Sequence, residues 1–182
     1  VIHELLARSA SRREPPCRYF GACGGCQLQH INYQTQLEAK TGFIRDALKR
    51  VGRIDWPREI AIKHAAEFGY RARAQVKIER GDESTTRIGF ARAGSRSVCD
   101  VEDCRILLPR LDAGLGDLRK SVLRDPVKFP NRVDINIAAD DSSVSFEPQV
   151  SGLPGGVLSR KVAGFDFRFS PTTFFFFFFL LF

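Results

Sequence analysis

Three cysteines close together near the start of the chain constrain its fold more than any other feature. Cys17, Cys23 and Cys26 have the spacing C-x5-C-x2-C, and three glycines between them let the backbone turn back on itself. Such a loop can direct its sulfur atoms at one centre, as a soft metal ion or an iron-sulfur cluster requires. The spacing therefore predicts a metal-binding loop over residues 17–31, without helix or strand.

A metal site of this kind needs a fourth ligand, because both tetrahedral zinc and a four-iron cluster take four. Cys99 or Cys104 can supply it from a distant hairpin. Spacing alone does not separate zinc from iron-sulfur, so both stay open. Two disulfides are a weaker alternative, because the number of cysteines is odd and no secretion signal is visible. Cys99 has no neighbouring base in the sequence, which favours a buried thiol over a nucleophile.

The positive charge of the chain is concentrated in its first half. The formal net charge is +7; residues 1–80 carry 15 Lys and Arg against 8 Asp and Glu, and residues 81–182 carry 13 of each. A basic segment favours a polyanionic partner such as nucleic acid, although a solvated surface has a similar composition. The longest apolar run has nine residues, fewer than the roughly 20 of a membrane-spanning helix, so no membrane partner is expected.

The residue pattern predicts an α+β fold in which antiparallel hairpins accompany two helices. Apolar residues at helical spacing predict a first helix between Asn32, a suitable N-cap, and Gly52, a suitable residue after the last turn. A second helix is expected over 106–123, weakened by Pro109 and two glycines. Alternating or short apolar runs predict strands over 60–65, 70–79, 87–91, 133–138, 144–146 and 162–169. The strand over 70–79 has one buried and one basic face.

The last nine residues break every pattern that precedes them. Phe174 to Phe179 are six consecutive phenylalanines, and with Phe182 they supply seven of the sixteen in the chain. The run has neither strand alternation nor helical periodicity, and if exposed it would promote aggregation. We interpret this tail as an artefact of a frameshift, a truncation or an uncertain sequence. The chain contains no methionine, even at position 1, which also indicates a piece of a longer protein.

Three stretches of the chain share their motifs with one enzyme family. They are EPPCRYFGACGGCQLQHINYQTQLEAK at 14–40, GYRARAQVKI at 69–78 and GFARAGSRSVCDVEDCRILLP at 89–109. Together they resemble the RNA uracil-5-methyltransferases, specifically the branch that forms 5-methyluridine in 23S ribosomal RNA. The first stretch is similar to that family's iron-sulfur segment, the second to a basic strand of its central domain, and the third to the hairpin that carries its last cluster ligand.

The resemblance implies a 4Fe-4S cluster on Cys17, Cys23, Cys26 and Cys104, whereas Cys99 stands where the family usually has an aliphatic residue. It also implies three parts. These are the end of an oligonucleotide-binding barrel and a linker at 1–14, an iron-sulfur and RNA-binding central domain at 15–168, and the start of a truncated, Rossmann-like methyltransferase domain at 169–182. In that family the catalytic cysteine and base lie in the third domain, so no catalytic residue is expected in this chain.

A short motif near the end of the chain also resembles the family. FSPTTFF at 169–175 is similar to the start of a segment in which an aromatic residue helps to hold the target base, so Phe174 is an expected RNA contact. The family continues with Gln, which contacts S-adenosylmethionine, and Asn. Here Phe176 and Phe178 stand at those polar positions. No contact with S-adenosylmethionine is therefore expected from this chain, although the full-length protein would use it as methyl donor.

The basic face of the strand over 70–79 supplies the other expected RNA contacts. They are Arg71, Arg73 and Lys77, whose charges can meet phosphates, and a solvated strand face is the alternative.

The resemblance thus implies part of an S-adenosylmethionine-dependent 23S ribosomal RNA uracil-5-methyltransferase in the cytoplasm, which acts on ribosomal RNA and on neither DNA nor membranes. The alternative function is a stand-alone RNA-binding module, stapled by an iron-sulfur cluster or zinc and without catalysis. A transfer RNA uracil methyltransferase is less favoured, because that branch usually lacks the cluster cysteines.

Overall fold

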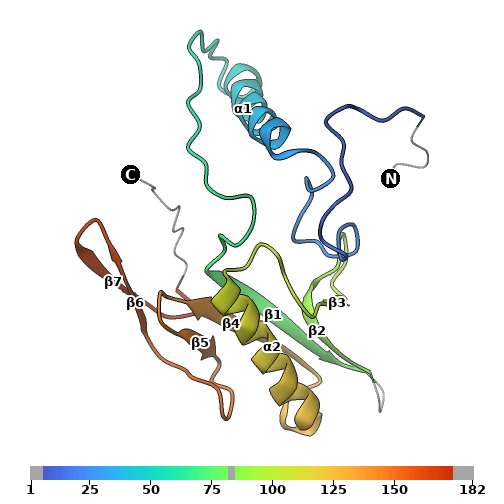
Figure 1. The fold of residues 1–182 in the computed structure, drawn as a ribbon, viewed down its shortest axis with the longest axis vertical. Helices are drawn as coiled ribbons and strands as arrows, with labels where there is room; N and C mark the ends of the chain where they lie inside the picture. Colours follow the sequence, from blue (N-terminus) through green and yellow to red (C-terminus); the bar gives the residue numbers. More distant parts are fainter. Residues whose placement is uncertain (1–5, 82–84, 174–182) are drawn as a thin grey trace. The chain divides into compact units, whose positions relative to one another are not determined.

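The chain divides between a unit built on one helix and a unit built on an antiparallel sheet (Figure 1). The computed structural model describes residues 6–81 and 85–173. The first unit comprises residues 1–20 and 26–64, and the second comprises residues 21–25 and 65–182. The cysteine loop therefore contributes chain to both units.

The first unit contains helix α1 (Tyr33–Arg50). Its predicted N-cap is confirmed, because the Asn32 side chain accepts a hydrogen bond from the Thr35 amide at 2.9 Å. The helix ends near Gly52 as predicted, where the Gly52 amide still donates to the Ala47 carbonyl. The left-handed residue of this C-terminus is Arg53, with φ of 53°, and not the glycine.

The strand predicted over 60–65 is wrong, because these residues have no regular secondary structure. Residues 61–64 are exposed, and no strand among the described residues pairs with them. A short apolar run does not make a strand without a hydrogen-bonded neighbour, since its amides and carbonyls then stay with water.

The second unit is built on a five-stranded antiparallel sheet with the order β3-β2-β1-β4-β5. Its strands are β1 (Arg73–Arg80), β2 (Thr86–Ala91), β3 (Val98–Asp100), β4 (Arg132–Ala139) and β5 (Val144–Glu147). The alternation predicted for β1 is confirmed, since Ala74, Val76 and Ile78 are buried and the residues between them are more exposed. The predicted hairpins β1–β2 and β4–β5 also form, which confirms the α+β fold with an antiparallel sheet.

Helix α2 (Pro109–Arg124) crosses one face of this sheet (Figure 1). The leucines at 111, 115 and 118 and the valine at 122 are fully buried at helical spacing. The predicted start at residue 106 was three residues too early, because Pro109 occupies the first helical turn, where a missing amide is harmless. A short 3-10 turn, η1 (Pro126–Lys128), follows. Neither helix has the length and apolarity needed to cross a membrane within the described chain.

The strand predicted over 162–169 is confirmed only over 165–169, because this region belongs to a hairpin whose first strand and turn the prediction missed. Its strands are β6 (Leu158–Val162) and β7 (Phe165–Phe169), which pair with each other in a separate two-stranded sheet. Ala163 and Gly164 form the two-residue turn with φ of 49° and 86°. Two successive left-handed residues are what a tight hairpin turn requires, and the Ala-Gly pair was the only local sign of it.

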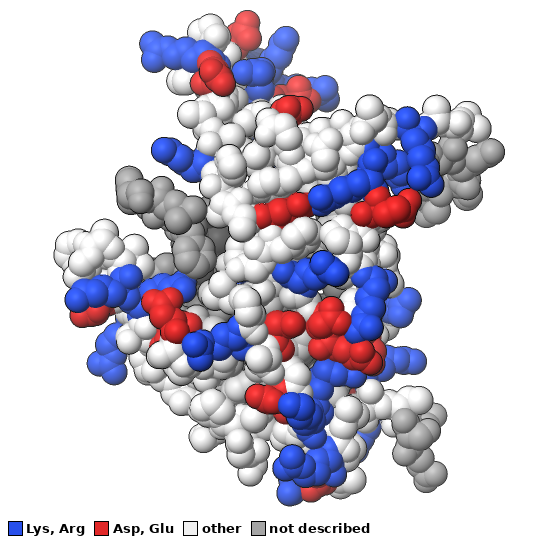
Figure 2. Space-filling view, viewed as in Figure 1, with Lys and Arg blue, Asp and Glu red and all other residues white. Residues whose placement is uncertain are grey.

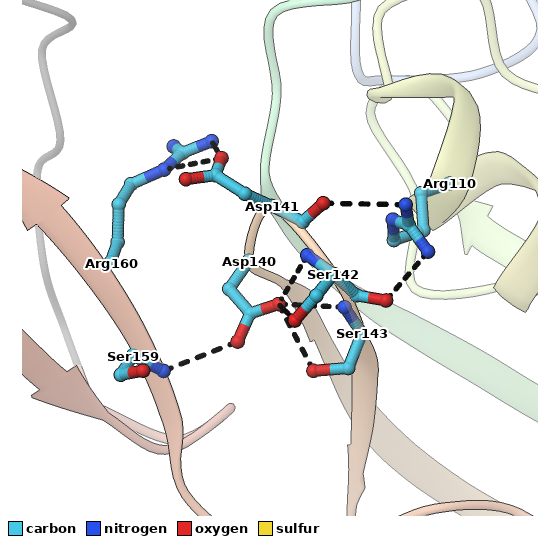
Figure 3. Close-up of polar contacts among 7 residues, drawn as sticks. All are labelled: Arg110, Asp140, Asp141, Ser142, Ser143, Ser159 and Arg160. Carbon is cyan, nitrogen blue, oxygen red and sulfur yellow. Dashed lines mark hydrogen bonds and ion pairs between the residues drawn. The ribbon is translucent and has the colours of Figure 1, made fainter.

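A buried carboxylate organises the turn between β4 and β5 (Figure 3). Asp140 accepts hydrogen bonds from the amides of Ser142 at 2.8 Å and Ser143 at 2.7 Å, and from both hydroxyls. Its other oxygen accepts the amide of Ser159 in β6 at 3.2 Å. Burial raises the pKa of Asp140, but these hydrogen bonds outweigh it by stabilising the charged form, and they lower the pKa to about 2.

Two arginines extend this turn to neighbouring elements (Figure 3). Arg110 of α2 donates to the carbonyls of Ser142 at 2.7 Å and Asp141 at 3.3 Å. Arg160 of β6 donates to the Asp141 carboxylate through Nε at 3.1 Å and through Nη2 at 2.7 Å. The turn therefore fixes the base of the β6–β7 hairpin and the start of α2.

Replacing Gly89 by alanine is expected to destabilise the second unit. A Cβ there would collide with the Cys99 carbonyl and lie 2.8 Å from the Val101 amide nitrogen, both backbone atoms of the β3 region. Overpacking against backbone should cost about 2–3 kcal/mol of unfolding free energy. Gly116→Ala in α2 is the matched control, because no atom lies within 4 Å of its Cβ, and it should stabilise by about 0.5–1 kcal/mol. Urea denaturation of both variants measures this, and equal midpoints would contradict it.

The charge of Asp140 is expected to stabilise the fold at neutral pH and not in acid. Its pKa lies below the ordinary 3.8, so the stabilisation is complete above about pH 4 and is lost as the pH falls through about 2. Asp140→Asn, which keeps an acceptor oxygen, should lower the unfolding free energy by about 1–2 kcal/mol at pH 7. Denaturation curves over a pH series should show the difference from wild type shrinking towards pH 2. A difference independent of pH would refute this role of the charge.

Candidate metal and RNA-binding site

The middle of the cysteine loop pairs with the turn between β2 and β3. The Gly24 amide donates to the Ala91 carbonyl at 2.9 Å, and the Ala93 amide donates to the Ala22 carbonyl at 2.9 Å. Cys23 lies between these bonds in an antiparallel bridge. A Cβ at Gly24 would lie 3.2 Å from the Ala91 oxygen, so glycine permits the close approach of the two backbones. Residues 21–25 are thus held on the second unit.

Cys104 lies in the loop between β3 and α2, and the first turn of α2 fixes its backbone. Its amide donates to Asp112 Oδ1 at 2.7 Å, and its carbonyl accepts the Leu107 amide at 3.0 Å. Burial raises the pKa of Asp112, the bond from the Cys104 amide opposes the rise, and the charge of Asp103 adds to it. A carboxylate near a helix N-terminus is favourably placed, because it faces the positive end of the helix dipole. The start of α2 therefore holds the predicted fourth ligand.

Arg119 of α2 holds the β2–β3 hairpin that leads to Cys104. Its Nη1 atom donates to the Ile88 carbonyl and to Asp100 Oδ1, both at 2.7 Å, and Nη2 lies 3.3 Å from Asp100 Oδ2. Burial raises the pKa of Asp100, but hydrogen bonds from Arg119 and the Ile88 amide, with the charge of Arg119, lower it below its ordinary value. The sequence analysis missed Arg119 and Asp112, because a charged residue on a helix resembles any solvated one until its partner is known.

The four predicted cluster ligands come from both units. Cys17 and Cys26 belong to the first unit, whereas Cys23 and Cys104 belong to the second. All four are partly exposed free thiols, and Cys99 is a buried free thiol in β3. Among the residues that the structure describes, no three Cys, His, Asp or Glu side chains are grouped as a metal site. The structure therefore does not assemble the ligand set, which remains a prediction.

The chemistry of the donors nevertheless suits a cluster. Four thiols are the donor set that a four-iron cluster uses. The Gly25 amide donates to Cys23 Sγ at 3.4 Å, a hydrogen bond that stabilises a thiolate and tunes a metal bound to it. Burial of Cys99 in the sheet, 4% exposed, suits the role of a small apolar residue better than that of a ligand.

The predicted RNA-binding cations of the β1 region have neighbours within the protein. Lys77 forms an ion pair with Asp134 of β4 at 2.7 Å. Arg73 donates to two backbone carbonyls of residues 171 and 172. Arg71 is exposed, and its Nε donates to the Arg73 carbonyl at 2.9 Å. Phe174, the fourth predicted contact, lies outside the described residues.

The same face of the sheet carries further ion pairs. Glu79 of β1 contacts Arg87 of β2 at 3.3 Å and Arg132 of β4 at 3.6 Å. On the other side of the sheet, which α2 covers and Figure 2 draws, blue and red side chains also lie beside one another. The excess of cations in the sequence is therefore not a uniform basic face, and Arg71 is the most accessible of the three predicted phosphate contacts.

Comparison with known proteins finds relatives that are longer than this chain. It is 36% identical over 145 residues to the 23S rRNA (uracil(1939)-C(5))-methyltransferase RlmD of Halomonas elongata, a match that covers 79% of this chain and 29% of that protein. It is 38% identical over 149 residues to an uncharacterized RNA methyltransferase of Aquifex aeolicus, covering 80% and 33%. The chain thus spans about a third of the length of these curated relatives. No protein-family model matches the sequence.

A solved structure shares the fold. The tRNA (uracil-54, C5)-methyltransferase of Pyrococcus abyssi, in complex with S-adenosyl-L-homocysteine, superimposes with a TM-score of 0.59 over 94% of this chain and 49% of that one. The sequence identity is 18%, so this likeness concerns the fold alone.

Proposed function

Because the chain belongs to the RNA uracil-5-methyltransferase family, we propose that it is the cluster-bearing and RNA-binding part of a 23S ribosomal RNA uracil-5-methyltransferase. The observation that carries this proposal is its 33–36% identity to several proteins named as such enzymes. The methyl donor is S-adenosylmethionine, and the enzyme acts on ribosomal RNA in the cytoplasm. We also propose the domain boundaries that the resemblance implies, at 1–14, 15–168 and 169–182.

The chain's own residues serve binding and positioning in this proposal. Cys17, Cys23, Cys26 and Cys104 hold a 4Fe-4S cluster. When bound, it would be linked to the chain by four bonds between iron and cysteine sulfur. These bonds tie the cysteine loop to the start of α2, since Cys23 pairs with the β2–β3 turn and Asp112 holds Cys104. The cluster is in this view a structural staple. No catalytic role is proposed for any described residue.

The RNA contacts proposed for the chain are phosphate contacts by Arg71 and Lys77, and a base contact by Phe174. Arg71 is supported best, because its side chain is exposed on the segment that enters β1. Lys77 forms an ion pair with Asp134 at 2.7 Å, and the negative carboxylate weakens the attraction of Lys77 for a phosphate. Arg73 is considered separately below.

Removal of the fourth ligand is expected to abolish cluster binding. After anaerobic purification the wild-type chain should hold about four iron and four sulfide per molecule with broad visible absorption. Cys104→Ala should lose most of both, and the matched control Cys99→Ala should keep them, because Cys99 is buried in β3. Metal analysis and absorption spectra measure this. Zinc without a visible band would overturn the cluster and favour a zinc-stapled RNA-binding module.

Loss of Arg71 is expected to weaken RNA binding through one phosphate contact. A stem-loop RNA with uridines in its loop serves as the probe, and its affinity is measured by filter binding across a salt series. Arg71→Ala should reduce the slope of log affinity against log salt by about 1. Arg124→Ala, which removes an exposed cation of α2, is the control and should leave the slope unchanged. An unchanged slope for Arg71→Ala would remove it from the RNA interface.

A further inference from the structure

The four residues after β7 form a turn that is held against the sheet. The Ser170 amide donates to the Thr173 hydroxyl at 3.1 Å, and the Thr173 amide donates to the Ser170 carbonyl at 3.1 Å. Pro171 in the middle of this turn is fully buried. A buried proline within a closed turn has little freedom, so the segment 170–173 has a fixed place on the second unit.

Two strands hold this turn from different directions. Arg73 of β1 donates through Nε to the Pro171 carbonyl at 2.6 Å and through Nη2 to the Thr172 carbonyl at 3.5 Å. From β5, Glu147 accepts the hydroxyl of Thr172 at 3.0 Å. Hydrogen bonds with one charged partner are stronger than neutral ones, and both of these contacts have one. We call residues 73, 147 and 170–173 the connector clamp.

The sheet beneath the clamp leaves room for it. Ala138 of β4 is the register partner of Arg73, so both side chains lie on the same face of the sheet. Ala138 forms a buried cluster with Leu158 of β6 and Phe169 of β7. The small side chain thus lets the base of the β6–β7 hairpin pack on this face, which brings the segment after Phe169 within reach of Arg73.

This arrangement distinguishes Arg73 from the other cations of its face. Lys77 pairs with a carboxylate side chain and Arg71 is exposed, whereas Arg73 reaches across 98 residues of sequence to backbone carbonyls. A guanidinium can direct two of its N–H groups at neighbouring carbonyls, and an ammonium cannot reproduce that fork. A cation held in this way contributes little to a phosphate site unless it leaves the clamp.

We propose that Arg73 is a positioning residue and not a direct phosphate contact. Its bonds to the carbonyls of Pro171 and Thr172 hold the turn 170–173 in place. The inference rests on the proposed function in one respect, namely that Phe174 contacts the target base. Arg73 then affects RNA binding indirectly, by holding the turn 170–173 that precedes Phe174 in the sequence.

Hydrogen–deuterium exchange of the free chain tests the clamp without RNA. Arg73→Ala is expected to speed exchange of the amides of residues 170, 172 and 173 by about tenfold, because a hydrogen bond to a charged group is lost. Arg73→Lys should give most of the same increase, since it keeps the charge and loses the fork. Thr172→Val removes the bond to Glu147 and should loosen the same peptide. Lys77→Ala is the matched control on the same strand face and should leave the peptide unchanged.

RNA binding over a salt series gives the second readout, with the stem-loop probe used for Arg71. The proposal predicts an unchanged salt slope for Arg73→Ala and Arg73→Lys. A slope reduced by about 1 in Arg73→Ala and restored in Arg73→Lys, with unchanged exchange at 170–173, would overturn it in favour of a phosphate contact. If the wild-type chain binds no RNA, the proposed function fails, whereas the exchange measurement still decides whether the clamp exists.

Discussion

The contact between Arg119 and Asp100 is the interaction on which the candidate site depends. The Arg119 side chain is only 13% exposed, and it bonds the carbonyls of Ile88 and Val101 as well as the carboxylate. These bonds fix the β2–β3 hairpin on α2, and residues 21–25 form backbone hydrogen bonds with the turn of that hairpin. The first turn of the same helix holds Cys104 through Asp112. One helix therefore positions both cysteines of the second unit that the cluster would use, and its buried leucines make that support rigid.

Several charged residues of the sheet form ion pairs, and this weakens the argument from composition for a polyanionic partner. The net charge of +7 and the basic first half favoured a polyanionic partner, yet Lys77 and Glu79 on β1 both have oppositely charged neighbours on adjacent strands. Partly exposed pairs of this kind add little to stability, but they lower the local potential that a phosphate would meet. In the proposed function, affinity for RNA would therefore depend less on the total number of cations than on exposed ones such as Arg71 and on fixed geometry.

Local patterns predicted much of the fold, and contacts distant in sequence explain what they missed. The start of α1 could be predicted from Asn32, because an N-cap contacts a residue only three positions away. The alternation in β1 could be predicted because the strand has one buried face. Residues 60–65 had the composition of a strand, but no strand in the described part of the chain pairs with them, which no local pattern reveals. The prediction of one strand over 162–169 missed β6 and the turn that follows it, because that turn has a single glycine. For the site, the cysteine spacing pointed to the loop, whereas Asp112, Arg119 and the carbonyl partners of Arg73 depend on how distant segments meet.

The pairing of residues 21–25 with the β2–β3 turn bears on the order in which the protein matures. Gly24 and Ala91 are 67 residues apart in sequence, and closing a loop of that length costs conformational entropy before the contact forms. The hairpin, by contrast, joins neighbouring strands and can form early. On this argument the cysteine loop would dock on a sheet that already exists, and Cys23 would reach its place late. Insertion of the proposed cluster would then follow folding of the sheet, and a newly made chain would pass through a folded, metal-free state in which its thiols are open to oxidation.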